Sequence, residues 1–191
     1  MAMTPAIFLD KDGTLLVDVP YNVDPALMRF APTVAQGLAR LGSLNRPLIV
    51  ISNQPGVAFG MFTIGDLSRV RAQLAAMFRS AGAHLHDFYY CPHHPEGVVA
   101  PYAVACRCRK PLPGLLHAAA SDHAIDLSAS WFIGDILDDV EAAWRAGCRS
   151  VLVNNGNETE WHSAAGRVPD RIVSDFSGAS REVLGQYRQP A

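Results

Sequence analysis

IFLDKDGTL, residues 7–15, joins a short apolar run to two acids, Asp10 and Asp12, and then to a glycine. An apolar run of this length is typical of a buried strand in a parallel sheet. Ligands of open α/β sheets bind at the carboxyl ends of the strands, and both acids directly follow the predicted strand. Residues two apart in an extended segment point to the same side, so we expect Asp10 and Asp12 to face one ligand. The short pattern alone could also be an Asx turn that closes a strand.

Strand-like and helix-like segments alternate along the rest of the chain. Apolar runs predict strands, the last of them a short edge strand, at residues 6–9, 48–51, 88–90, 131–133, 150–153 and 172–173. Amphipathic stretches predict helices at residues 33–41, 64–81, 114–123 and 138–146. This alternation indicates a doubly wound, Rossmann-like α/β fold, in which helices cover both faces of a mostly parallel sheet.

Length and composition favour one globular domain, residues 1–191, with 49% hydrophobic and 18% charged residues. A net charge of −2 would attract neither DNA, RNA nor an anionic membrane, so we expect neither nucleic acid nor a membrane as partner. The N-terminal apolar run ends at Asp10, which is too early for a signal peptide, and no stretch is long enough for a transmembrane helix. We therefore expect a cytoplasmic protein, a monomer, with a frayed tail at residues 186–191.

Three more polar residues occupy similar positions. Ser52 ends the second strand in ISNQPG, Lys110 precedes a helix in CRKP, and Asp135 ends a strand in FIGDILDD. A hydroxyl and a lysine at such places could hold phosphate oxygens. Ser52 could also belong to an ordinary polar turn, and Lys110 could be a solvated surface lysine. Acids in the first turn of a helix are common because they stabilise its N-terminus, which we prefer for Asp138. Asp135 precedes the helix at the end of a strand and is better explained as an oxygen ligand of a metal.

Together these residues predict phosphoryl transfer through a covalent intermediate. A carboxylate such as Asp10 can attack phosphorus, which replaces one difficult displacement by two easier ones. Asp12 can protonate the leaving alkoxide and then deprotonate the attacking water. Magnesium takes one or two carboxylates and keeps several waters, so Asp10, Asp135 and the backbone carbonyl of Asp12 are candidate ligands.

A segment rich in cysteine and histidine, residues 91–110, leads to Lys110. The candidate zinc ligands form a C-x-H pair and a C-x-C pair: Cys91, His93, Cys106 and Cys108. Three thiolates and one imidazole make a closed tetrahedral site, so we expect Zn²⁺ to support folding and not catalysis. The alternatives are incidental buried cysteines, or His94 as the ligand in place of His93.

In this order, the motifs resemble the haloacid dehalogenase superfamily of phosphatases, from about Ile7 to Val153. The resemblance implies that Asp10 is the nucleophile and Asp12 the general acid and base. It implies phosphoryl contacts from Ser52 and Lys110, and magnesium ligation by Asp10, Asp12 and Asp135.

YYCPHHPEG and CRCRKPLPG further resemble the zinc-containing branch of this superfamily, which has no large cap over its site. The resemblance implies these substrate-binding residues: Tyr21, Asn22, Ser52, Asn53, Gln54, Arg109 and Lys110. Arg109 would contact the part of the substrate that is distant from the transferred phosphate.

Within that branch the chain is similar to the phosphatases of D-glycero-D-manno-heptose 1,7-bisphosphate. The implied substrate is a small phosphorylated sugar that loses its 7-phosphate on the route to nucleotide-activated heptose, for lipopolysaccharide or other glycans. Two positions depart from the pattern: Phe59 stands where a basic residue is usual, and Ile136 where lysine is frequent. Histidinol-phosphate phosphatases share the zinc pattern and are the alternative. A non-catalytic phosphate-binding domain is a remote one.

Overall fold

The computed structural model describes residues 3–162 and 164–188, and its centre is a parallel six-stranded sheet. The strand order is β3-β2-β1-β4-β5-β6. The strands are β1 Ile7–Leu9, β2 Leu48–Asn53, β3 Leu85–Cys91, β4 Trp131–Gly134, β5 Arg149–Val153 and β6 Arg171–Val173. All pairs are parallel, and strand order reverses on either side of β1. This is the doubly wound arrangement that the alternating segments predict.

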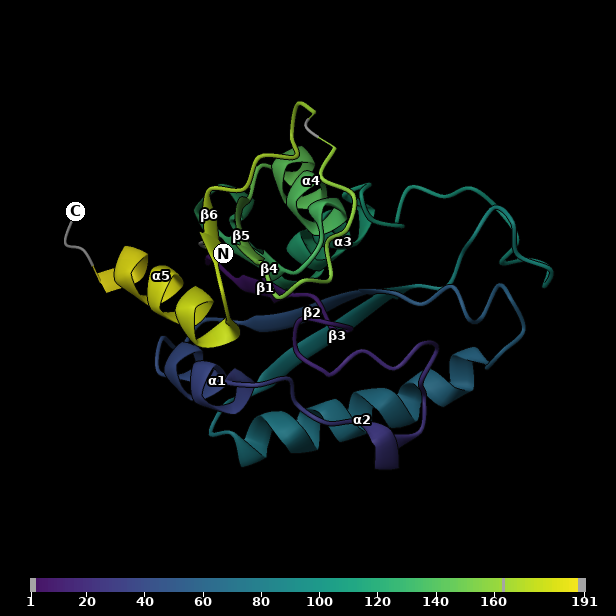
Figure 1. Cartoon of the computed structure of the whole chain (residues 1–191), viewed down its shortest axis with the longest axis horizontal. Coiled ribbons are helices and arrows are strands. Elements are labelled where there is room, and N and C mark those ends of the chain that lie inside the picture. Colours follow the sequence, from purple (N-terminus) through teal and green to yellow (C-terminus); the bar gives the residue numbers. More distant parts are fainter. Residues whose placement is uncertain (1–2, 163, 189–191) are drawn as a thin grey trace.

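Helices cover both faces of the sheet (Figure 1). One face carries α1 Val34–Gly42, α2 Ile64–Ser80 and α5 Phe176–Arg188; the other carries α3 Gly114–His123 and α4 Leu137–Ala146. Short 3-10 helices are η1 Pro25–Leu27 and η2 Leu127–Ala129. The alternation of strand side chains builds both cores, because Ile7 and Leu9 pack with α1 and α2 while Phe8 between them packs with α3 and α4.

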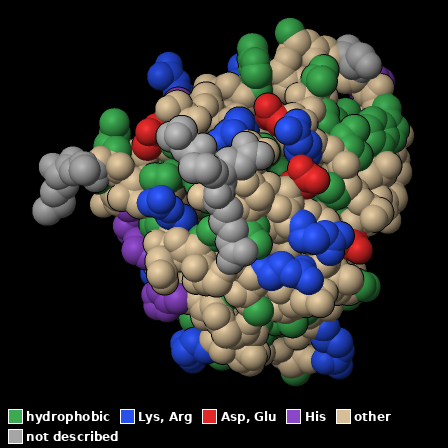
Figure 2. Space-filling view, turned by 90° about the vertical axis from the view of Figure 1, so that its left-hand side faces the viewer, with side chains coloured by type: hydrophobic (Ala, Val, Ile, Leu, Met, Phe, Trp, Pro, Cys, Tyr) green, Lys and Arg blue, Asp and Glu red, His purple; other side chains and the backbone are tan. Residues whose placement is uncertain are grey.

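The topology creates a crevice at one end of the sheet. The chain leaves β1 toward one face and β4 toward the other, so their carboxyl ends flank the point where ligands of doubly wound folds bind. The segment after β3 projects beyond this end of the sheet (Figure 1). Within the described residues no separate cap domain covers the crevice. Figure 2 views the opposite end, near the starts of the strands, where basic side chains are dispersed as separate groups.

The C-terminal part of the described chain differs from the expectation. The helix α5 was not predicted; Phe176, Ala179 and Val183 bury its apolar side in the core that α1 shares. Residues 186–188, within the tail expected to fray, belong to this helix, and the Tyr187 hydroxyl donates to the Ala129 carbonyl (2.7 Å). Residues 189–191 lie outside the described residues. Among those described, no helix is both long and apolar enough to cross a membrane.

Candidate active site

Asp10 directly follows the central strand β1 and is almost fully buried. Its backbone N–H donates to the carbonyl of Ile133 in β4 (2.9 Å), which extends the pairing of the two strands by one residue. Its carboxylate accepts a hydrogen bond from the ammonium of Lys110. The protein thus holds a carboxylate at the wall of the crevice, in a position to act as a nucleophile.

Lys110 reaches the same place from the segment after β3. Its ammonium pairs with Asp10 and with Asp139 (2.6 Å) and donates to the Ile51 carbonyl (3.2 Å). Asn53 holds the backbone of this lysine: its Nδ2 donates to the Lys110 carbonyl (3.1 Å), and its Oδ1 accepts from the Lys110 N–H (3.0 Å). Burial alone would lower the pKa of Lys110, but the two carboxylates outweigh it and raise that pKa above its ordinary value. The lysine therefore presents a fixed positive charge.

Asp135 follows β4 and is held on both oxygens. The Thr14 hydroxyl donates to Oδ1 (2.6 Å), and Asn157 Nδ2 donates to Oδ2 (2.6 Å). Gly13 lies against this carboxylate at φ +83°, and a Cβ there would be only 2.3 Å from Asp135 Oδ2. A residue without a side chain is therefore required beside Asp135.

Three buried carboxylates, those of Asp10, Asp135 and Asp139, each offer an oxygen within 4.8 Å of the others. Burial raises the pKa of Asp10 to about 7 and that of Asp135 to about 6. Asp139 already pairs with Lys110, and its other oxygen accepts from the N–H groups of Asp135 and Ile136 (3.2 and 3.4 Å). Asp10 and Asp135 are thus the carboxylates available to a cation, and hard oxygen ligands of this kind fit Mg²⁺.

Asp12 lies at the rim, with about a third of its side chain exposed (34%). Its Oδ2 accepts from Gln54 Nε2 (3.0 Å), and the same nitrogen donates to the Ser52 hydroxyl (2.7 Å). Lys11 Nζ lies 2.5 Å from Asp12 Oδ1. A side-chain network thus joins the rim acid to the buried serine at the end of β2.

A cavity of about 290 Å³ collects these groups; it is lined by Asp10, Asp12, Asp18, Ser52, Asn53, Lys110, Asp135, Ile136 and Asn157. A second cavity, of about 250 Å³, shares Asp12, Asp18 and Asn53 with the first and extends to Tyr21, Asn22 and Gln54. The structure therefore brings the expected catalytic residues into one crevice. It places most of the expected substrate residues in the adjoining space.

Arg109 is placed differently. It lines a third cavity, which meets the first at Lys110 and also contains His94 and Asp138. Within the described residues its Nη1 is buried without a hydrogen-bond partner. The Phe59 ring is tilted against that of His94 (centroids 4.8 Å apart) and lies edge-on to Tyr21 (6.3 Å), so a row of rings links Tyr21 of the second cavity to His94 of the third.

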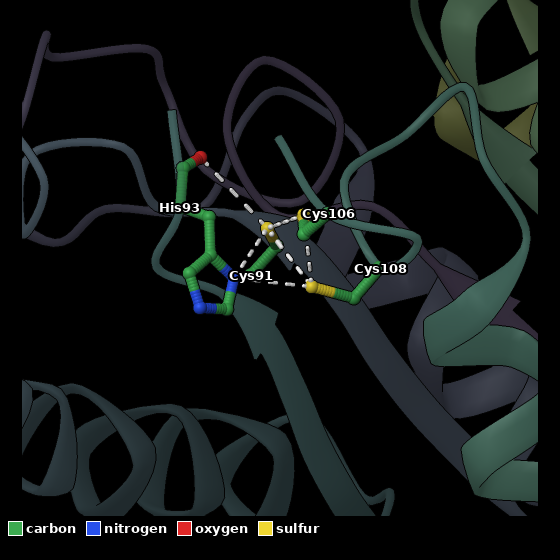
Figure 3. A group of neighbouring side chains, drawn as sticks. All are labelled: Cys91, His93, Cys106 and Cys108. Carbon is green, nitrogen blue, oxygen red and sulfur yellow. Dashed lines mark hydrogen bonds between the residues drawn. The ribbon is translucent and has the colours of Figure 1, made fainter. Parts of the chain in front are cut away.

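The four predicted zinc ligands converge at the end of β3 (Figure 3). The Cys108 sulfur lies 3.2 Å from those of Cys91 and Cys106 and 3.3 Å from His93 Nδ1; Cys91 lies 3.5 Å from Cys106 and 3.7 Å from His93 Nδ1. A zinc tetrahedron with ordinary bonds has edges of roughly 3.4–3.8 Å. The five separations, 3.2–3.7 Å, lie within or slightly below that range, so the four donors are close enough together to hold one ion. All four cysteines of the chain, Cys148 included, are free of disulfides. The Nδ1 atom of His94 instead accepts from the Glu96 N–H (3.2 Å), which leaves His93 as the cluster's imidazole.

Comparison with known proteins agrees with this geometry. The chain is 34% identical over 185 residues to the D-glycero-beta-D-manno-heptose-1,7-bisphosphate 7-phosphatase of Yersinia pestis, covering 96% of this chain and 97% of the relative. The enzyme of the same name from Escherichia coli K12 is 38% identical over 153 residues, 80% of each chain. The profile of a family described as HAD-hydrolase-like matches residues 107–179. The chain belongs to the haloacid dehalogenase-like phosphatases.

Comparison with solved structures supports the same family assignment for this phosphatase. A HAD-like phosphatase structure from Mesorhizobium loti superimposes with a TM-score of 0.84 at 31% identity, covering 98% of this chain and 87% of the other. The heptose bisphosphate phosphatase of B. bronchiseptica, solved with magnesium and phosphate, gives 0.78 at 27% identity and covers 96% and 99%. The expectation of a Rossmann-like phosphatase without a large cap is confirmed.

Several residues of the phosphatase site were not predicted from the sequence. Thr14 and Asn157 orient Asp135, Lys11 contacts Asp12, and Asp139 pairs with Lys110. One signal existed for Lys11, which stands between the two acids of the first motif.

Proposed function

We propose that this phosphatase removes one phosphate from a small sugar bisphosphate, D-glycero-β-D-manno-heptose 1,7-bisphosphate, through a phosphorylated Asp10. The observation that carries the proposal is the convergence of Asp10, Lys110 and Asp135 in one crevice with Asp12 at its rim. The names of the relatives from Yersinia pestis and Escherichia coli support the substrate.

The proposed reaction has two steps. An Asp10 oxygen attacks phosphorus, the bond from phosphorus to the sugar oxygen breaks, and that oxygen takes a proton from Asp12. A water then attacks the phosphorus of the acyl phosphate and gives a proton to Asp12; the bond to Asp10 breaks, and inorganic phosphate leaves. Lys110 and the Ser52 hydroxyl would hold the phosphoryl oxygens during both displacements.

A divalent cation fits the acidic end of this crevice. Asp10, Asp135 and the backbone carbonyl of Asp12 would hold Mg²⁺, which neutralises charge on the phosphoryl oxygens when bound. The observation in favour is the burial of two carboxylates whose pKa values are raised, because such a pair favours a bound cation.

Zinc is proposed for the cluster of Cys91, His93, Cys106 and Cys108, since four protein donors leave no open position for substrate. An ion there would tie the end of β3 to the segment that presents Lys110. The free thiols in a metal-like arrangement support a reducing compartment such as the cytoplasm.

A phosphomonoester with a neutral or cationic distal end, such as histidinol phosphate, is a second candidate. The observation in its favour is that Asp18 lines the second cavity, whereas the lining residues that the structure describes include no lysine, arginine or histidine. A second phosphate would therefore need the third cavity, where Arg109 offers a buried donor without a partner.

Phosphate release separates the candidates. Both anomers of heptose 1,7-bisphosphate, heptose 7-phosphate and histidinol phosphate are compared by kcat/KM with Mg²⁺, and Asp10→Asn serves as the control for contaminating phosphatase. We expect the bisphosphate to be the best substrate and Asp10→Asn to be inactive, because an amide cannot readily form the acyl phosphate. A higher kcat/KM for histidinol phosphate than for the bisphosphate would make histidinol phosphate the first candidate substrate. An active Asp10→Asn variant would reject the proposed mechanism.

A further inference from the structure

The chain contains only two lysines, and both are buried beside the catalytic crevice. Lys110 forms ion pairs with Asp10 and Asp139. Lys11, in contrast, has no role in the proposed reaction. Lys11 lies between the two acids of the first motif and is only 2% exposed. Its Nζ lies 2.5 Å from Asp12 Oδ1. A charged side chain buried at this position needs an explanation, because burial of an ammonium is costly unless it is paired.

The pair of Lys11 and Asp12 differs from an ordinary surface ion pair. Exposed pairs contribute little, because two long side chains must lose their freedom to meet. Here the lysine is already ordered by burial, whereas Asp12 is short and partly exposed. The ion pair therefore restricts the orientation of the Asp12 carboxylate and not that of the lysine.

A second contact holds the other oxygen of the Asp12 carboxylate. Gln54 Nε2 donates to Asp12 Oδ2, so Lys11 and Gln54 hold one oxygen each. Each carboxylate oxygen has two acceptor positions, so both contacts leave a place for a transferable proton. The carboxyl plane is thus fixed without being blocked.

We propose that Lys11 is a positioning residue that holds the Asp12 carboxyl in line with the leaving-group oxygen. This inference rests on the proposed role of Asp12 as general acid. Its consequence is a dependence on the leaving group. A sugar alkoxide needs a proton in order to depart, whereas p-nitrophenolate departs with little help, and a positioned general acid contributes about 10²–10⁴-fold.

The test compares kcat/KM for a sugar phosphate and for p-nitrophenyl phosphate, because this parameter reports the steps up to leaving-group departure. Lys11→Met removes the charge and keeps most of the volume. We expect kcat/KM to fall about 10- to 100-fold for the sugar phosphate and less than about threefold for p-nitrophenyl phosphate. Lys11→Arg should recover part of the loss. If Lys11→Met does not fold, as judged by thermal unfolding, Lys11→Gln is compared in the same way.

The variant Asp12→Asn tests the role of Asp12 as general acid separately from the role of Lys11. If Asp12→Asn loses both substrates equally, the proposed general acid fails. If Asp12→Asn shows the leaving-group dependence and the Lys11 variants do not, only the role of Lys11 is rejected. An equal loss of both substrates in Lys11→Met would assign the lysine to phosphate binding or to the fold, and no loss would also overturn the proposal.

Discussion

Gly13→Ala tests how closely the turn after β1 approaches Asp135. The backbone of Gly13 has φ +83°, and a Cβ would lie 2.3 Å from Asp135 Oδ2 and 2.6 Å from Asn157 Nδ2. The substitution therefore imposes a strained backbone and a clash with a carboxylate that is itself held by hydrogen bonds. Gly147→Ala is the matched control, because Gly147 has φ +78° but a Cβ added there would meet no atom within 4 Å.

The two substitutions share the backbone cost and differ in the clash. An L-residue in the left-handed region costs about 1 kcal/mol, and overpacking adds about 1–3 kcal/mol. Gly13→Ala should therefore destabilise by about 2–4 kcal/mol and Gly147→Ala by about 1 kcal/mol. For a chain of this length each kcal/mol lowers Tm by about 2–4 °C, which gives losses of about 4–16 °C and about 2–4 °C.

Thermal unfolding of both variants checks the stability, and the Mg²⁺ dependence of turnover checks the site. Because the new methyl group displaces Asp135 from Asp10, Gly13→Ala should raise the Mg²⁺ concentration for half-maximal activity by at least about tenfold. Gly147→Ala should leave it unchanged. If the two variants lose the same stability and keep the same Mg²⁺ dependence, the close approach of Gly13 to Asp135 is refuted.

The remaining predictions concern the metals and the distal phosphate. The purified protein should contain about one zinc per chain; Cys106→Ser should lose zinc and stability, whereas Cys148→Ser, outside the cluster, should keep its zinc. Burial raises the pKa of Asp10 to about 7 and that of Asp135 to about 6, so the folded chain without Mg²⁺ binds protons more tightly than the unfolded chain. The stability of the chain without Mg²⁺ should therefore fall as pH rises from about 5 to 8. Mg²⁺ should then raise Tm more at about pH 8 than at about pH 6, and equal shifts would contradict the assignment. Arg109→Ala should raise KM for a sugar bisphosphate about 10- to 100-fold and change that for a monophosphate much less; equal changes would show that Arg109 does not contact a second phosphate.

The positions of the strands in the sequence, and of Asp10 and Asp135 at two strand ends, could be predicted because both depend on local pattern. A buried parallel strand must be apolar throughout, and its first polar residue then marks the carboxyl end of the sheet. Asp10 and Asp135 follow β1 and β4 in this way, and these strands are neighbours in the sheet. The helix α5 was missed because its sequence, FSGASREVLGQYR, is rich in serine and glycine. Its packing includes the ring of Phe176 against Gly37, a position that has no side chain.

The sequence alone determined which chemistry is possible, whereas the tertiary structure decided which neighbouring residue performs it. Asp138 and Asp139 are adjacent acids in the first turn of α4 and look equivalent in the sequence. Consecutive helix residues point about 100° apart, so the two carboxylates meet different neighbours. The packing of α4 on the sheet pairs Asp139 with Lys110 and leaves Asp138 to Arg167. The contact of Asn157 with Asp135 spans 22 residues, and contacts of that kind depend on how distant segments pack, which local spacing does not encode.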